Sequence, residues 1–297
     1  MTLFQHDYSI KTESECNSEC NREVRGLSTA HIPPVADGNN TERENIHQIA
    51  IEPAKLETWR GASRIKISHE KIQIPQRGGG QRGAVTLFSR QSRKRLLDTL
   101  AEIDKTEKPL FLTLTYPSKF AADARVWKND LEKFYKRMKR KFPAASFIWK
   151  LEPQKRGAPH FHLFVWGMSY DALFIWARRA WFETVGSGDE KHLMAGTRVE
   201  KVRSWRGVRS YASKYMGKIF DMPMMQDLGW NQPGRFWGVK GRQNLPQVMA
   251  TVLEIMSEKQ VFDMLRYLRR YSGIKGRKYR SLSIICENPE RWEALLQ

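Results

Sequence analysis

The sequence predicts an α+β fold, and three features support this. Residues 110–117, LFLTLTYP, form a continuous run of β-favouring residues that Pro117 ends. A stretch of helical periodicity follows. Two further strand-like runs then come close together, SFIWKL at 146–151 and HFHLFVW at 160–166. The order strand, helix, strand, strand therefore places helices and a sheet in one domain.

Three helices are expected from apolar residues three and four positions apart, with Lys and Arg on the other face. They cover residues 89–104, 124–142 and 169–186, and Ser169 is the expected N-cap of the third. In the second helix the spaced apolar residues include several aromatic ones. We expect these residues in the core rather than stacked on bases.

Shorter elements are expected beyond residue 188. The sequence predicts a strand at 197–202, a helix from about Ser204 to Gly217, a strand and turn at 234–246, a β-rich run at 247–255, a helix capped by Ser257, and a short helix capped by Asn288. Residues 266–280, from the second half of the Ser257 helix onward, are densely basic, with interleaved Tyr residues. This composition suits contact with phosphates and bases, and a solvated helix end is the alternative.

The chain divides by composition into an acidic beginning and a basic body. Residues 1–60 contain six Lys or Arg against ten Asp or Glu and are rich in Ser, Asn and Thr, so we expect a disordered or loosely attached segment. The whole chain nevertheless has a net charge of +19, so the positive charge is concentrated in the remainder. We expect one domain at 61–247 and a basic strand-helix extension packed on it at 248–297.

A strongly basic body with interleaved aromatic residues favours a nucleic acid as partner, although a ribosome-binding or merely solubilised surface would look similar. No apolar run of about 18 residues and no basic leader before an apolar segment is present, so a soluble, non-secreted, cytoplasmic protein is expected. Three Cys residues suit a reducing compartment. A zinc site at Cys16 and Cys20 is disfavoured because the tight Cys-x-x-Cys turn is missing.

His160 and His162 lie two apart on a predicted strand, so both imidazoles project to one side. Glu152 ends the preceding apolar run, and its carboxylate can reach the same side if the two runs are antiparallel neighbours. Two imidazoles and one carboxylate suit a divalent metal ion with open coordination positions. The alternative is a pair of ordinary strand histidines with satisfied hydrogen bonds.

Tyr211 and Tyr215 lie four apart on a predicted helix, with Lys214 and Lys218 on or beside the same face. Taken alone, the pattern is that of buried structural tyrosines. Beside a metal site it indicates a different chemistry. A divalent ion neutralises the charge that develops on a phosphodiester, and a nearby cation helps the weakly nucleophilic tyrosine to attack it.

FLTLTYP, PHFH and YASKYMGK, in that order over about 110 residues, resemble the three motifs of the HUH endonucleases. More narrowly, the chain is similar to the two-tyrosine rolling-circle replication initiators of single-stranded DNA phages and related plasmids. The resemblance implies a central antiparallel sheet of about five strands with helices packed on one side. The histidine strand would be central, and the tyrosine helix would face the metal.

The resemblance also gives each matching residue a role. His160 and His162 match the metal-binding histidines, and Glu152 falls where related initiators often place a third ligand. Thr113 and Thr115 lie in the first motif, which is mainly architectural. In the third motif Tyr211 matches the nucleophile, Tyr215 the second tyrosine and Lys214 the motif lysine.

The function implied is that of a DNA nicking and closing endonuclease. It would use Mg²⁺ or Mn²⁺, act on single-stranded origin DNA or a hairpin extruded from it, and form a 5′-phosphotyrosine. No Walker-type motif follows, so a host helicase and polymerase in the bacterial cytoplasm are expected partners. The alternatives are a transposase or relaxase of the same class, or a basic nucleic-acid-binding module without catalysis.

Overall fold

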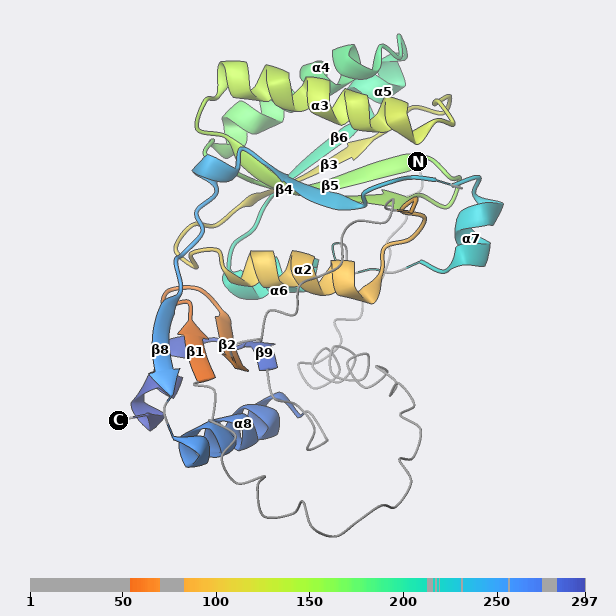
Figure 1. Ribbon diagram of the computed structural model, residues 1–297. Coiled ribbons are helices and arrows are strands. Elements are labelled where there is room, and N and C mark those ends of the chain that lie inside the picture. The colour runs from red at the N-terminus through yellow and green to blue at the C-terminus, as the bar shows by residue number, and fades with distance from the viewer. Residues whose placement is uncertain are drawn as a thin grey trace, which may run out of the picture. The chain divides into compact units, whose positions relative to one another are not determined.

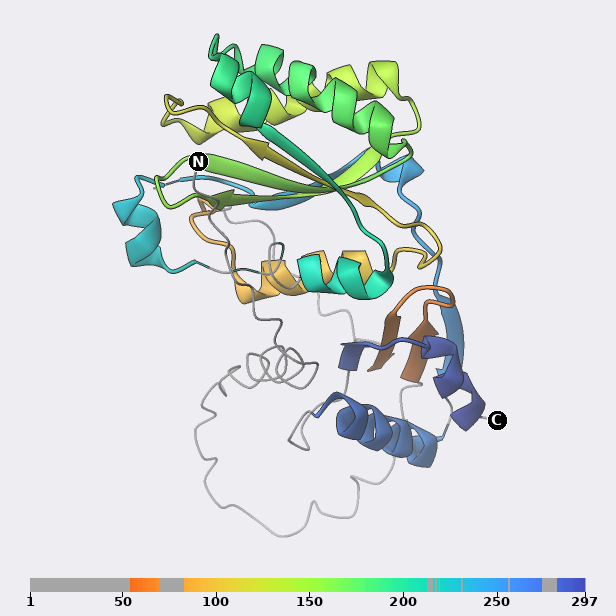
Figure 2. The same ribbon diagram turned by 180° about the vertical axis from the view of Figure 1, so that it is seen from behind.

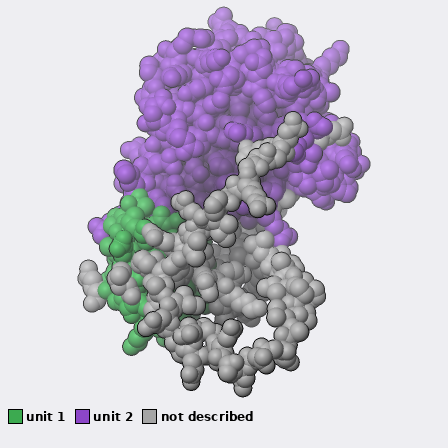
Figure 3. All heavy atoms as spheres, viewed as in Figure 1, with its two compact units in different colours: residues 1–58, 65–73, 250–297 green, residues 59–64, 74–249 purple. Residues whose placement is uncertain are grey.

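The structure is a computed structural model that describes residues 54–69, 83–212, 216, 218, 220–230, 232–255, 257–273 and 282–296. The chain divides into two compact units (Figure 3). The larger unit comprises residues 59–64 and 74–249, and the smaller unit takes in 65–73 and 250–297 together with the chain up to Thr58. Most of the segment predicted to be disordered, residues 1–53, lies outside the described residues. Residues 54–58 form a strand.

The larger unit is built on a five-stranded sheet in the order β6-β3-β5-β4-β7, in which all neighbouring strands are antiparallel (Figure 1). The histidine strand β5 is therefore the central one. The strands are β3 (Leu110–Thr115), β4 (Ser146–Pro153), β5 (Pro159–Trp166), β6 (Thr197–Lys201) and β7 (Trp237–Lys240). The α+β class and the central five-stranded antiparallel sheet are confirmed.

Helices lie on both sides of this sheet. In both views α3, α4 and α5 cover one face, as predicted, while α2 and α6 lie by the other (Figures 1 and 2). A short helix, α7, follows α6 in the chain. The helices are α2 (Arg90–Ala101), α3 (Ala124–Lys141), α4 (Tyr170–Val185), α5 (Glu190–Ala195), α6 (Trp205–Tyr211) and α7 (Met222–Asp227).

The long helices begin and end where their capping residues predict. Ser169 caps α4 by accepting a hydrogen bond from the backbone N–H of Ala172, and Asp123 caps α3 in the same way through Arg125. Helix α4 ends at Gly186, which adopts a left-handed conformation with φ of 65°. The loop that follows leads through α5 to β6, the edge strand beside β3.

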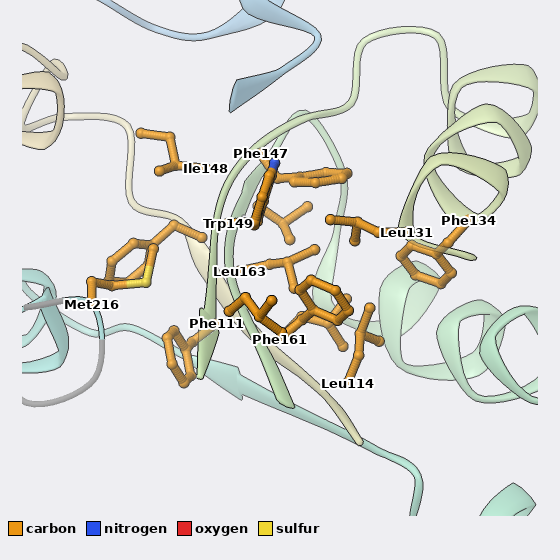
Figure 4. Packing of buried hydrophobic residues seen from close by; sticks show 14 of the residues in the cluster. Phe111, Leu114, Leu131, Phe134, Phe147, Ile148, Trp149, Phe161, Leu163 and Met216 are labelled. Atoms are coloured by element: carbon orange, nitrogen blue, oxygen red, sulfur yellow. The ribbon is translucent and has the colours of Figure 1, made fainter. Parts of the chain in front are cut away.

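The face of the sheet under α3 and α4 belongs to the large hydrophobic core of this unit (Figure 4). Leu114, Phe161 and Leu163 point toward Leu131 and Phe134 of α3. Each fully buried side chain of this kind contributes about 1.5–3 kcal/mol relative to exposure. The same core cluster continues on the other side of these strands, where Phe111, Ile148 and Met216 are also buried.

The smaller unit contains a four-stranded sheet in the order β8-β1-β2-β9. Its strands are β1 (Ala54–Thr58), β2 (Arg64–His69), β8 (Thr251–Ile255) and β9 (Leu282–Ile285), and helix α8 (Glu258–Ser272) begins at the predicted cap Ser257. Leu56, Ile67, Leu265 and Leu268 belong to its separate core.

The predicted last helix is a 3-10 helix, η5 (Pro289–Leu295), and Asn288 makes no side-chain capping bond. The hydroxyl of Thr58 on β1 donates to the Glu293 carboxylate of η5. No helix within the described ranges combines the length and the apolar character needed to cross a membrane.

Candidate functional site

The register of three neighbouring strands places two rows of polar side chains on one face of the larger sheet. On β5, His160 lies between Thr115 of β3 and Glu152 of β4. One step along, His162 lies between Thr113 and Lys150 of the same two strands. The structure thus brings together His160, His162 and Glu152, which lie on the face opposite α3 and α4.

His162 contacts both of the other candidate ligands. The two imidazole rings have centroids 4.5 Å apart, and Nε2 of His162 donates to Oε1 of Glu152 at 2.6 Å. The second carboxylate oxygen of Glu152 is buried and has no hydrogen-bond partner within the described part of the chain. A buried carboxylate oxygen without a partner is costly, and a bound cation would satisfy it.

The charge states suit a metal site. Burial raises the pKa of the Glu152 carboxyl, but the hydrogen bond from His162 and the charges of His162 and Lys150 outweigh burial and hold the net pKa below its usual value. Burial, reinforced by the charge of His162, lowers the pKa of His160 to about 4. At neutral pH Glu152 is therefore a carboxylate and His160 a neutral imidazole, which are the forms that bind a cation.

Threonine hydroxyls on β3 face the Nδ1 atoms of both histidines. Thr115 Oγ1 lies 3.1 Å from Nδ1 of His160, and Thr113 Oγ1 lies 3.3 Å from Nδ1 of His162. Both Nε2 atoms are therefore turned away from β3. For His160, a proton on Nδ1 that is donated to Thr115 leaves the lone pair on Nε2 available to a metal ion. For His162, whose Nε2 donates to Glu152, the proton would have to move to Nδ1 before an ion binds.

The end of β3 is held from the other side of the sheet. The backbone carbonyl of Thr115 accepts hydrogen bonds from Trp181 Nε1 of α4 and from His192 Nε2 of α5, each at 2.8 Å. Nδ1 of His192 is hydrogen-bonded to the Ser187 hydroxyl at 2.8 Å. Sequence reasoning missed His192, because no motif marks a residue that acts on the site through a backbone carbonyl.

The three candidate ligands would have to rearrange to hold a metal ion. Within the described ranges, no group of three or more His, Cys, Asp and Glu side chains is spaced to hold a metal ion as it stands. His162 Nε2 and Glu152 Oε1 are at hydrogen-bond distance, whereas two ligands bound to one ion at about 2.1 Å lie about 3 Å apart. These two side chains would have to move apart to bind one ion, and the donor set of two imidazoles and one carboxylate suits a divalent ion.

Tyr211 lies at the end of α6, on the same side of the sheet as the histidines. Its ring packs on Phe111 with centroids 4.6 Å apart, and Phe111 stacks on His162 at 5.5 Å. The Tyr211 hydroxyl donates to Oε1 of Glu200 on β6 at 3.4 Å. This bond directs the hydroxyl to β6 rather than to the histidine pair. Lys214 and Tyr215, the other two predicted residues of the tyrosine motif, lie outside the described residues.

An open pocket of about 480 Å³ lies beside Glu152 and His160. Its rim is basic, with Lys155, Arg156 and Lys218 among the lining residues. The Arg156 guanidinium donates to the backbone carbonyls of three successive residues, 116–118, and so ties the β4–β5 turn to the loop after β3. The pocket offers a positively charged surface for an anion next to the two candidate ligands.

Lys150 is the second residue that sequence reasoning missed. Its side chain is fully buried on the site face, where the ammonium group donates to the carbonyl of Leu151 at 3.0 Å. The rings of Phe88, Phe220 and Phe236 lie 4.4, 5.7 and 5.7 Å from it. Burial lowers the pKa of Lys150 to about 8, although the charge of Glu152 opposes this shift.

The comparisons with known proteins cover the part of the chain that holds this site. Residues 109–220 match a family model of replication-associated proteins, the ORF2 family. The matched stretch contains both histidines, Glu152 and the tyrosine motif, and its similarity is consistent with a replication initiator. No curated protein matches the chain, and no solved structure does.

Proposed function

We propose that the chain is a rolling-circle replication initiator that nicks and rejoins single-stranded DNA at a replication origin. The match of residues 109–220 to replication-associated proteins supports the biological role. The observation that carries the chemistry is one sheet face on which His162 contacts His160 and Glu152, with Tyr211 reached through Phe111. The basic charge of the chain supports DNA as the substrate.

His160, His162 and Glu152 would hold Mg²⁺ or Mn²⁺ in this proposal. The ion, when bound, neutralises charge that develops on the scissile phosphate. With an ion bound, Thr113 and Thr115 would accept the Nδ1 protons of the histidines, and His192 and Trp181 fix the carbonyl of Thr115. The basic rim of the pocket, with Lys155 and Lys218, orients the DNA backbone beside Glu152 and His160.

Tyr211 would be the nucleophile, and its hydroxyl, which here points to Glu200 on β6, would have to turn toward the phosphate held at the histidine pair. Its phenol oxygen loses a proton and forms a bond to phosphorus, the bond from phosphorus to the 3′-oxygen breaks, and the 3′-oxygen takes up a proton. Glu200, which accepts the hydrogen bond of this hydroxyl and also pairs with Arg198 at 2.8 Å, is the proposed proton acceptor. The resemblance gives Lys214 the role of stabilising the phenolate and Tyr215 that of receiving the new end after one round.

The product carries a 5′-phosphotyrosine and a free 3′-hydroxyl. Because the phosphodiester energy is kept in the protein link, the displaced strand can later be closed without an external energy source. The 3′-hydroxyl would prime synthesis by a host polymerase, with a host helicase opening the duplex in the bacterial cytoplasm.

The test is a cleavage assay on full-length protein with a pool of labelled single-stranded hairpin oligonucleotides and Mg²⁺ or Mn²⁺. We expect a covalent protein-DNA band in denaturing electrophoresis that EDTA prevents. A variant with Tyr211→Phe and Tyr215→Phe should bind the pool as the parent does and give no adduct. Tight binding without any cleavage by the unaltered chain would instead favour the non-catalytic binding module.

A further inference from the structure

The outer surface of α3 carries an unusual excess of positive charge. The helix has 18 residues, ARVWKNDLEKFYKRMKRK, of which eight are Lys or Arg and two are Asp or Glu. Its apolar residues face the sheet and are buried, as Leu131 and Phe134 show. The exposed residues of the helix include six of its cations: Arg125, Lys133, Lys136, Lys139, Arg140 and Lys141.

The two acidic residues of α3 do not neutralise this surface. Asp130 is buried and accepts a hydrogen bond from the Tyr116 hydroxyl at 3.0 Å, and its one ion pair on the helix is a 3.5 Å contact with Lys133. Glu132 pairs with Lys240 of the neighbouring strand β7. In the described part of the chain, Lys136, Lys139 and Arg140 have no carboxylate within ion-pair distance.

Helix stability explains only part of the pattern. Lys139, Arg140 and Lys141 lie in the last turn, where a cation interacts favourably with the helix dipole by about 0.3–1 kcal/mol. Lys133 and Lys136 lie further from the C-terminus and gain little from it. Helix α2 of the same unit differs, because its exposed Lys94 pairs with Asp98 four residues later.

The position of α3 separates its cations from the candidate site. Figures 1 and 2 both show α3 on one face of the five-stranded sheet, and the histidine pair lies on the other face. A DNA strand held in the pocket by Glu152 and His160 therefore cannot contact α3 over the same few nucleotides. The outer face of α3 is therefore a basic surface separate from the pocket.

We propose that the outer face of α3 binds the phosphate backbone of the duplex DNA that adjoins the nicking site. Lys133, Lys136 and Arg140 lie three and four residues apart on one stripe and span about 10 Å along the helix axis. Each strand of B-DNA has one phosphate per about 3.4 Å of axis, so a duplex offers several charges over that length. This inference rests on the proposed action at a DNA origin and adds where the uncut duplex is held.

The experiment compares two triple variants of equal charge, measured by fluorescence anisotropy on a duplex of about three helical turns over a range of salt concentrations. One variant replaces Lys133, Lys136 and Arg140 by Gln. The matched control replaces Lys108, Lys191 and Lys201, which are exposed on other parts of the same unit, by Gln. Thermal melting checks that both variants fold.

Each lost phosphate contact reduces the magnitude of the slope of log K against log salt by about 0.9. The slope for the α3 variant should therefore be smaller in magnitude than the parental slope by about 2–3, and the slope for the control should be nearly unchanged. Adduct formation on a short single strand should equal that of the parent in both. Equal slopes for parent and α3 variant, or equal losses in both variants, would overturn the proposal in favour of a solvated face, an acidic protein partner or a general charge effect.

This design tests the proposed duplex-binding surface and the proposed nicking site independently. His160→Ala should abolish the adduct and leave the salt slope on duplex DNA unchanged. A parent chain that forms no adduct but shows the α3-dependent slope would refute the nickase and keep the duplex surface.

Discussion

The two faces of the five-stranded sheet use the same strands for opposite purposes. On the face under α3 and α4, alternate residues such as Phe161 and Leu163 are apolar and interdigitate with the helices. On the other face, the intervening positions of β4 and β5 hold His160, His162 and the buried charges of Lys150 and Glu152. Burying charge opposes folding unless a partner compensates it.

If the proposed function holds, the difference means that one face mainly provides stability and that the other provides the chemistry. Replacements on the apolar face should lower the free energy of unfolding and affect cleavage only through folding. Replacements of the polar residues on the other face should reduce metal binding and cleavage by more than any loss of folded protein explains. Variants at adjacent residues of one strand can test this contrast directly.

The largest effect is expected for the double variant His160→Ala/His162→Ala. Without two of the three proposed ligands, metal-dependent cleavage should fall by at least about 10⁴-fold, equivalent to about 5.5 kcal/mol of lost transition-state stabilisation. Single-turnover cleavage of a labelled hairpin measures this loss, and thermal melting serves as the control for folding. Cleavage that survives at more than a tenth of the parental rate would remove these histidines from the mechanism.

Phe161 lies between the two histidines in the chain, but its fully buried ring is on the opposite face. Phe161→Ala should destabilise the protein by about 3–5 kcal/mol, because it deletes this ring from the core. Urea unfolding followed by far-UV circular dichroism gives the value. At a temperature where the variant remains folded, its cleavage rate per folded molecule should match that of the parent. A stability loss below about 1 kcal/mol would mean that this face is not the core described above.

A smaller effect is expected for Thr115→Val, which removes the hydroxyl that faces Nδ1 of His160. Loss of such an indirect partner typically lowers metal affinity about 10–100-fold. Isothermal titration with Mn²⁺ measures the affinity, and Thr115→Ser, which retains a hydroxyl, should restore most of it. If Ser and Val behave alike, the hydroxyl does not orient the histidine.

The smallest effect concerns Asp130, a buried charge on the α3 side. Burial raises the pKa of its carboxyl and outweighs the hydrogen bond from Tyr116 and the charge of Lys133. A carboxyl with a raised pKa in the folded state stabilises the fold at low pH and loses that contribution as pH rises through the raised pKa. Unfolding free energies from about pH 4 upward should therefore decline more for the parent than for Asp130→Asn, and parallel curves would contradict the assignment.

The sequence predicts which face of the sheet a residue lies on better than it predicts the order and register of the strands. Period-two alternation in β5 is enough to place His160 and His162 on one side, and helical spacing is enough to identify the inward residues of α3. Strand order and register depend on contacts between distant residues, so the resemblance rather than the periodicity supplied the central position of β5. The pairing of β1 with β8, about 200 residues apart, has no local signal.

The site residues also differ in how readily the sequence identifies them. Glu152 was found because a carboxylate next to a histidine strand is a recognisable donor. Lys150 lies two residues earlier in the same strand, but a single sequence does not show that an apolar run buries a lysine among aromatic rings. His192 acts through a backbone carbonyl, which no pattern of side chains reveals.

The central claim is that a phenol oxygen of this chain becomes linked to DNA beside the histidine pair. Mass spectrometry of the peptide that remains on a cleaved oligonucleotide after protease digestion tests it most directly. The account predicts a nucleotide attached through its 5′-phosphate to Tyr211 in the presence of Mg²⁺ or Mn²⁺, and none when EDTA is added. Cleaved DNA with a free 5′-phosphate and no attached peptide would contradict it.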